Sequence, residues 1–261
     1  MPSSPPRTLR ETCPVCGSTQ HASRFGVERQ AKSFTFAKCG GCGFVFVTDP
    51  ESDTASHADH GALVWRFRRR HHQTRRLLLK HLKPGARIAE IGCGRGELGY
   101  LLRGDKFDYV GYEPARGLSD FGRAHGVQIV SDLFDQTHKG EADAVILDNV
   151  IEHVLDPAGL LRTAYEGLKP GGLLIVIVPN RSDIRALRPA WRTKNLWIPP
   201  DHINYFAASD LRRIFSMLNL RMRPFGFEAL GAQDWRYVPR ALLESIGVSL
   251  LGHNVYAVKG A

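Results

Sequence analysis

Four of the five cysteines stand in two pairs with the same spacing. Cys13 and Cys16 form one CxxC pair, Cys39 and Cys42 form the second, and 22 residues separate the pairs. Four thiolates arranged in this way can close a tetrahedral site around Zn²⁺, with Zn–S distances of about 2.3 Å. No long apolar leader precedes them, so reduced thiols are favoured over disulfides. A four-cysteine site leaves no open coordination position, and the expected zinc is therefore structural.

The segment around these pairs has the composition of short strands. Aromatic residues alternate with polar ones at Phe25, Phe34 and Phe36, and Phe44-Val45-Phe46 follows the second pair. So short a segment cannot bury a core large enough to fold alone, and the metal must supply much of its folding energy. We therefore expect a zinc ribbon over residues 1–50.

A second chemical feature is the glycine-rich run from Glu90 to Gly96, which joins an apolar stretch to an amphipathic one. Glycine is needed where backbone turns sharply or lies against a ligand, and the start of the following helix offers free N–H groups. Counting from Gly92, the sixth position is Glu97, so the dinucleotide fingerprint does not fit. The chain has no GxxxxGK[ST] segment either. What remains is an acidic residue closing a strand, followed by GxGxG.

Polar residues also follow the next three predicted strands. Glu113 comes directly after the second strand, and its carboxylate can accept hydrogen bonds from both hydroxyls of a ribose. Asp132 ends the third strand, although a helix-capping role for Asp132 or Asp135 stays open. Asp148 and Asn149 end the fourth. Carboxyl ends of parallel strands meet at one edge of a sheet, where ligands bind.

Strands and helices alternate along this part of the chain, which predicts a doubly wound α/β fold with a largely parallel sheet. The expected strands are 87–91, 109–112, 128–130, 144–147, 173–178 and 254–258. The expected helices are 63–82, 96–103, 116–125, 157–168 and 209–218.

The order of these motifs resembles the class I S-adenosylmethionine-dependent methyltransferases of the small-molecule type. Besides the glycine loop and Glu113, the chain carries Glu152-His153 before Asp156-Pro157, and a Lys-Pro-Gly-Gly turn before the fifth strand. The resemblance implies a Rossmann-like seven-stranded domain over residues 84–261 that binds S-adenosylmethionine. It implies these cofactor contacts: Glu90, Gly92, Cys93, Gly94, Asp148 and Asn149 at the methionine end, Glu113 and Pro114 at the ribose, Asp132 and Leu133 at the adenine.

Methyl transfer requires alignment and a deprotonated acceptor, so positioning can supply most of the catalysis. If a general base is used, His153 and His202 are the candidates, because imidazole titrates near neutral pH. His202 lies in a Pro-x-His-x-x-x-Phe segment that resembles the roof of the substrate pocket in such enzymes. Trp191, Trp197 and Ile198 are candidate apolar walls. For Cys93 we expect a small space-filling side chain and not a nucleophile.

A further resemblance concerns metal. Quinone O-methyltransferases can hold a divalent cation with a Glu-x-x-Glu-His segment at this position. Here Asn149 replaces the first acid while Glu152 and His153 are kept. We therefore expect no catalytic metal.

Basic residues concentrate before the first strand, in a chain of net charge +9. The resemblance identifies residues 51–83 as a basic helical connector that covers the cofactor pocket. Three interpretations stay open: a solvated face, a site for an acidic or phosphorylated small molecule, and a surface for nucleic acid. The basic side chains are Arg66, Arg68, Arg69, Arg70, His71, His72, Arg75, Arg76 and Lys80.

Together these features favour methyl transfer to a small-molecule acceptor such as a sugar, a polyketide or another metabolite. The sequence does not determine whether oxygen, nitrogen or carbon is methylated, nor the oligomeric state. An RNA methyltransferase is the first alternative, because a basic surface suits a phosphate backbone. A non-catalytic zinc-ribbon binding protein is the second. No apolar run is long enough to span a membrane, and Met1 to Pro6 form a polar tail, so we expect a cytoplasmic protein with no membrane contact.

Overall fold

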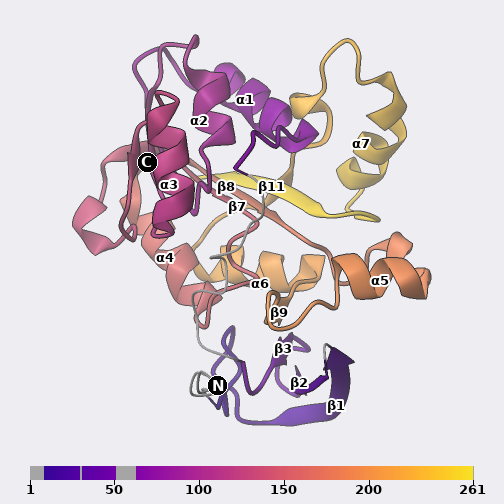
Figure 1. Ribbon diagram of the computed structural model, residues 1–261. Coiled ribbons are helices and arrows are strands. Elements are labelled where there is room, and N and C mark those ends of the chain that lie inside the picture. Colours follow the sequence, from indigo (N-terminus) through magenta and orange to yellow (C-terminus); the bar gives the residue numbers. More distant parts are fainter. Residues whose placement is uncertain (1–8, 30, 51–62, 261) are drawn as a thin grey trace.

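The computed structural model describes residues 9–29, 31–50 and 63–260. The tail before residue 9 and the first part of the predicted connector lie outside these ranges. Two sheets organise the described chain (Figure 1): a seven-stranded sheet of order β10-β11-β8-β7-β4-β5-β6, and a four-stranded sheet of order β1-β2-β3-β9. Within these ranges, no helix combines the length and the apolar character that a membrane span requires.

The larger sheet is mixed, with parallel strands at its centre. β4 pairs in parallel with β5 and β7, β5 with β6, and β7 with β8, whereas β11 runs antiparallel to β8 and β10 antiparallel to β11. The strands are β4 (Arg87–Ile91), β5 (Asp108–Tyr112), β6 (Ile129–Val130), β7 (Ala142–Asp148), β8 (Leu168–Val178), β10 (Arg223–Pro224) and β11 (His253–Val258). The predicted seven-stranded Rossmann-like fold is confirmed.

Helices cover both faces of this sheet, because successive strand side chains point to opposite sides. Ile88, Ile146 and Ile175 pack with α1 and α2 on one face, while Ala89 and Val145 pack with α4 and α6 on the other (Figure 1). The helices are α1 (Arg69–His81), α2 (Glu97–Leu102), α3 (Arg116–Ala124), α4 (Pro157–Gly167), α5 (Pro189–Asn195), α6 (Ala208–Met217) and α7 (Val238–Ser245). Short 3-10 turns cover Gln136–His138, Ile184–Leu187, Gly226–Ala229 and Trp235–Tyr237.

The basic helix begins later than predicted. We expected it from residue 63, but α1 starts at Arg69 and the segment before it is not helical. Tertiary contacts hold that segment. The ring of Trp65 packs 4.6 Å from that of Tyr100 and 5.0 Å from that of Phe121, and the N–H of Arg66 donates to Glu97 Oε1 at 3.2 Å. These contacts with α2 and α3 outweigh the helical periodicity of the segment.

The smaller sheet combines the cysteine-rich segment with a distant strand. β1 (His21–Arg29), β2 (Lys32–Cys39) and β3 (Val45–Val47) form an antiparallel meander, and β9 (Asn204–Tyr205) adds to the edge of β3. The sequence predicted short strands around the cysteines but not β9. The division of the chain at residues 50 and 83 stays a prediction.

Candidate functional site

The four cysteines lie together at one end of the small sheet. All four are free thiols, and their Sγ atoms lie within 4.8 Å of one another. Cys13 Sγ is 3.6 Å from Cys42 Sγ, and Cys16 Sγ is 3.5 Å from Cys39 Sγ. Sulfurs about 2.3 Å from a tetrahedral zinc stand roughly 3.8 Å apart, so the donor set fits this ion.

Each cysteine pair is closed by a glycine in a left-handed conformation. Gly17 has φ 72° and Gly43 φ 77°. Their N–H groups donate to the carbonyls of Cys13 at 2.8 Å and Cys39 at 2.9 Å. These backbone bonds shape the two turns that bring the cysteine side chains together.

The glycine loop lies between β4 and α2. Gly92, Gly94 and Gly96 have φ values of 64°, 59° and 78°, in the left-handed region that side chains rarely adopt. A Cβ atom at Gly92 would lie 2.7 Å from Val150, whereas one at Gly94 would meet nothing within 4 Å. Gly92 is therefore required by packing, and Gly94 leaves open space in which a ligand can approach the backbone.

Glu113 is buried beside this loop. Its Oε2 accepts a hydrogen bond from the Gly94 N–H and its Oε1 from the Ala115 N–H, both at 2.9 Å. A carboxylate offers about four acceptor positions, so both oxygens keep a lone pair for further donors. The arrangement holds the carboxylate next to the open side of Gly94 and suits a vicinal diol.

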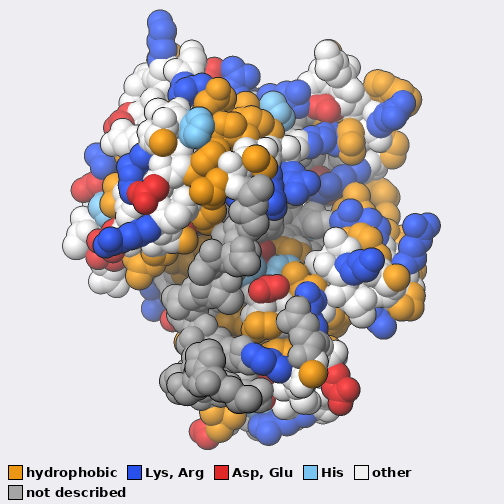
Figure 2. Space-filling view, in the orientation of Figure 1, with side chains coloured by type: hydrophobic (Ala, Val, Ile, Leu, Met, Phe, Trp, Pro, Cys, Tyr) orange, Lys and Arg blue, Asp and Glu red, His pale blue; other side chains and the backbone are white. Residues whose placement is uncertain are grey.

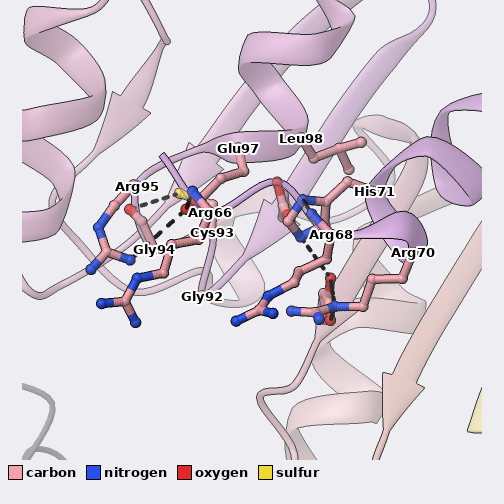
Figure 3. Close-up of a pocket in the computed structure, with 12 residues that line it drawn as sticks. Arg66, Arg68, Arg70, His71, Gly92, Cys93, Gly94, Arg95, Glu97 and Leu98 are labelled. Atoms are coloured by element: carbon pink, nitrogen blue, oxygen red, sulfur yellow. Dashed lines mark hydrogen bonds and ion pairs between the residues drawn. The ribbon is translucent and has the colours of Figure 1, made fainter. Parts of the chain in front are cut away.

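A pocket of about 210 Å³ opens over the glycine loop. The segment before α1 and the start of α1 cover it, and the guanidinium groups of four arginines lie along one side (Figure 3). The twelve lining residues are Arg66, Arg68, Arg70, His71, Glu90, Gly92, Cys93, Gly94, Arg95, Glu97, Leu98 and Asp148.

Asp148 ties the end of β7 to α1. Both of its oxygens accept from Nε of Arg70, at 2.6 and 2.7 Å, and Oδ2 lies 3.4 Å from Nε2 of His71. These contacts fix the first turn of α1 over the pocket.

Lys and Arg side chains are scattered over the described part of the face shown in Figure 2. Several other basic side chains of α1 have acidic partners that do not line the pocket. The pairs are Arg69 and Arg76 with Asp234, Arg75 with Asp105, and Lys80 with Glu228.

Glu90 is a buried acid at the floor of the pocket. The hydroxyl of Tyr109 donates to its Oε2 at 2.5 Å. Burial, together with the charges of Asp148 and Glu97, raises the pKa of Glu90 to about 8 against an ordinary value of 4.5. Burial also raises the pKa of the neighbouring Cys93 thiol well above its usual range, so that this thiol stays neutral. Its Sγ would lie 2.4 Å from a Cβ at Gly111, which is consistent with a space-filling role.

The raised pKa of Glu90 predicts a pH dependence of stability. Between pH 4.5 and about 8 the unfolded chain releases this proton while the folded protein keeps it, so stability falls as pH rises through this window. Glu90→Gln should remove this contribution. The difference in the free energy of unfolding between pH 5 and pH 8 should then be smaller by roughly 2 to 4 kcal/mol. Urea unfolding of both proteins at the two pH values measures it. An unchanged pH difference in the variant would contradict the raised pKa.

The open space at Gly94 predicts a specific loss of ligand binding. Gly94→Ala should cost about 1 to 2 kcal/mol of stability because of its positive φ. Its methyl group should also lower cofactor affinity at least tenfold by displacing the ligand from the backbone. Gly85→Ala is the matched control, since Gly85 has φ 86° and equally open surroundings but lies in the turn before β4. Titration calorimetry and thermal unfolding separate the two effects. Equal affinity in both variants would argue against a ligand at Gly94.

Other expected cofactor residues do not line this pocket. Leu133 is 65% exposed, and Asp132 Oδ1 accepts from the Leu133 N–H at 2.7 Å. Asp135, not Asp132, caps the following 3-10 turn by accepting from Thr137. Asn149 turns the chain out of β7 with φ 56°. Pro114 follows Glu113 beyond β5. The assignments of Asp132 and Leu133 to the adenine, of Pro114 to the ribose and of Asn149 to the methionine end stay predictions.

Glu152, His153 and His202 come together in a second cluster. Their ligand atoms lie within 4.8 Å of one another, and the two imidazole centroids are 5.0 Å apart. Nδ1 of His153 contacts the Asp201 carbonyl at 2.5 Å, and Nδ1 of His202 contacts that of Leu196 at 3.3 Å. If both Nδ1 atoms carry the proton, both Nε2 atoms are acceptors.

Glu152 is 1% exposed, and neither of its carboxylate oxygens has a hydrogen-bond partner among the described residues. Burial raises its pKa to about 8. The cluster can therefore share a proton or hold a cation. The expectation of no catalytic metal rested on Asn149 and did not consider His202; it stays a prediction.

Sequence reasoning missed several residues of these sites. Arg95 and Glu97 line the pocket from the loop and α2, and Arg10 and Asn204 join the cysteine-rich sheet to the histidine cluster. The spacing of the glycines predicted the loop itself but not these residues. No local pattern marks Arg10, because its partners lie far away in the chain. Trp197, expected as a pocket wall, stacks on Tyr205 at 4.6 Å beside the small sheet.

Comparison with known sequences supports this interpretation of the loop. The pattern that defines the methyltransferase-domain family matches residues 62–224, more than half of the chain. The ubiquinone biosynthesis O-methyltransferase of Ruegeria pomeroyi is 34% identical over 106 residues, which cover 38% of this chain and 43% of that protein. That of Azorhizobium caulinodans is 37% identical over 115 residues, covering 40% and 45%. The chain spans less than half the length of these curated relatives.

Solved structures show the same fold at low sequence identity. A SAM-dependent methyltransferase from Archaeoglobus fulgidus superposes with a TM-score of 0.52 at 21% identity, over 73% of this chain and 93% of that one. The plantazolicin methyltransferase BpumL in complex with SAH gives 0.55 at 12% identity, over 74% and 82%. The family match, the sheet order and the glycine loop agree: this chain belongs to the methyltransferase-domain family and has the class I S-adenosylmethionine-dependent fold.

Proposed function

We propose that this protein transfers a methyl group from S-adenosylmethionine to a small-molecule acceptor. The observation that carries the proposal is the pairing of Gly94 and Glu113. An open left-handed glycine stands beside a buried carboxylate that its own N–H orients. This arrangement accepts a ribose diol and lets the rest of the ligand lie against backbone.

The pocket supports placement of the methionine part of the cofactor over Gly92 and Gly94. Glu90 and Asp148 would be the acidic groups for its ammonium, and the arginines of the covering segment would be available to its carboxylate. The cofactor, when bound, supplies an electrophilic methyl group. Glu90 then favours its charged form, since a nearby cation stabilises a carboxylate.

The acceptor is expected near the histidine cluster. His202 and His153 are the candidates for removing a proton from it, and Glu152 stands next to both. An acceptor with an acidic or phosphorylated group would suit the arginines of the pocket that the cofactor's carboxylate does not take. Two relatives are named ubiquinone biosynthesis O-methyltransferases, which supports an oxygen atom as the methyl acceptor.

We also propose that three segments of the chain have separate roles. A structural zinc ribbon occupies residues 1–50, a covering segment residues 51–83, and the methyltransferase domain residues 84–261. The fit of four sulfurs to a tetrahedral ion supports the first assignment. The ion pairs that neutralise much of α1 support a small molecule over a nucleic acid, which needs a continuous basic surface.

The function is tested by binding followed by transfer. Calorimetry should show S-adenosylhomocysteine binding with one site per chain. With radiolabelled S-adenosylmethionine, label should then enter phenolic or acidic small molecules and not total RNA. Absence of cofactor binding would leave a non-catalytic protein, and label in RNA alone would replace the small-molecule proposal by the RNA alternative.

A further inference from the structure

His202 stands directly beside the small sheet. β9 begins two residues after it and pairs antiparallel with β3, with Val45 opposite Tyr205 and Phe46 opposite Asn204. The N–H of Val47 donates to the Ile203 carbonyl at 2.9 Å. The residue that follows His202 is thus already bonded to the cysteine-rich segment.

Arg10 makes a second link at the same place. It is 8% exposed, and its guanidinium donates to the carbonyls of Val47 and Ile203, both at 3.3 Å. It also donates to the Leu155 carbonyl at 3.1 Å and to Asn204 Oδ1 at 2.8 Å. One buried side chain therefore joins the small sheet, the His202 segment and the turn that follows His153.

Asn204 extends this link to the second histidine. Its side-chain amide donates to the carbonyls of Ile151 at 3.0 Å and Val154 at 2.6 Å. The backbone N–H groups of Ile203 and Asn204 both donate to the Glu152 carbonyl, at 2.9 and 3.1 Å. The segments that carry His153 and His202 are held to each other through β9.

An aromatic cluster fills the space between the small sheet and this region. Phe36 of β2 lies 5.2 Å, centroid to centroid, from both Trp197 and Tyr205. Phe25 of β1 lies 5.8 Å from Trp197, and Phe44 lies 5.1 Å from Phe206. Aromatic pairs at these distances add to the burial of their surface. The small sheet therefore packs as part of the domain and not as a tethered appendage.

We propose that the zinc ribbon supports the part of the active site that binds the methyl acceptor. We further propose that the metal held by its four cysteines fixes the position of His202. Cys39 ends β2 and Cys42 stands three residues before β3, so the metal joins β2 to β3, the strand to which β9 and Arg10 attach. This inference rests on the proposed methyltransferase function for the role of His202. The claim that the ribbon holds β9 in place does not depend on that function.

The cofactor pocket is lined by a different part of the chain. The residues lining the pocket over the glycine loop all lie between Arg66 and Asp148. Loss of the metal is therefore expected to loosen the His202 segment and to leave cofactor binding in place. A metal that merely stabilised the whole fold would affect both sides together.

The test is hydrogen exchange of the full-length protein, zinc-loaded and after chelation under reducing conditions. Amides of Ile203 to Phe206 should exchange at least tenfold faster without zinc, while those of β4 and β7 stay unchanged. Affinity for S-adenosylhomocysteine should change by less than about twofold. Elemental analysis should find zinc in the loaded protein only.

Two variants separate the sheet contact from the metal. Arg10→Ala should keep its zinc yet show faster exchange at Ile203 to Phe206, and Arg10→Lys should restore part of the protection. Glu28→Ala, an exposed acid on β1, is the matched control and should behave as the wild type. The conservative lysine variant distinguishes a positioning role from general loss of packing.

Three results would overturn the inference: unchanged exchange at Ile203 to Phe206 after zinc removal, equal loss of protection in β4 and β7, or a purified protein without ribbon metal. These differ from failure of the proposed function. That failure appears as no S-adenosylhomocysteine binding by the zinc-loaded wild type, whatever the exchange data show.

Discussion

Glu113→Ala is expected to weaken binding of S-adenosylhomocysteine at least 100-fold while leaving the protein folded. Two hydrogen bonds from ribose hydroxyls to a buried carboxylate contribute roughly 1.5 to 3 kcal/mol each, and tenfold in affinity corresponds to about 1.4 kcal/mol. The substitution also releases the Gly94 N–H, which Glu113 Oε2 holds at 2.9 Å, and so loosens the loop. Calorimetry measures the affinity, and thermal unfolding verifies the fold.

Glu113→Gln serves as the graded control. Its amide keeps one oxygen acceptor and the side-chain length, so it should lie between the alanine variant and the wild type. Affinity within threefold of wild type in Glu113→Ala would show that Glu113 does not contact the ribose. The pocket would then have to bind its ligand through the loop backbone alone.

His202→Gln is expected to lower kcat by 10² to 10⁴, with little change in cofactor affinity, because general-base catalysis contributes about this much. His202 is 8% exposed, and its ring lies 5.0 Å from that of His153. Steady-state kinetics with an acceptor identified by the labelling experiment provide the measurement.

Two controls sharpen this prediction. His72→Gln changes an exposed histidine of α1 and should retain the wild-type rate. Metal analysis of the wild type should give one zinc per chain, accounted for by the cysteines; a second ion lost in His202→Gln would assign the Glu152, His153 and His202 cluster to metal binding. A His202→Gln variant with a full rate would exclude His202 as the base.

Much of the fold followed from local signals. Glycine spacing and apolar runs act at short range, so the strands of the parallel sheet and the loop at Gly94 could be placed from the sequence. The Lys-Pro-Gly-Gly segment, expected as a turn before a strand at residue 173, is instead part of β8, which starts at Leu168. The paired cysteines predicted a cluster because metal ligation imposes its own spacing. Sites whose chemistry imposes a fixed local spacing of residues can therefore be predicted from the sequence.

Other features depend on contacts between distant segments. β9 is two residues long and has no strand signal of its own; it forms because Val45 and Phe46 present an open edge. The start of α1 was wrong by six residues because the packing of Trp65 outweighs helical periodicity. The cluster of Glu152 with His202 likewise arises from the chain returning after 50 residues, which no spacing rule describes.

The sheet β1-β2-β3-β9 also constrains the order in which the protein can be made. β3 leaves the ribosome early, whereas the strand that covers its edge follows roughly 150 residues later. At about 5 to 20 residues per second, the edge of β3 stays uncovered for on the order of 10 to 30 s. An uncovered edge strand can pair with strands of other chains. Early metal capture by the two cysteine pairs would limit this hazard, so the yield of soluble protein should depend on zinc supply during synthesis and not only afterwards.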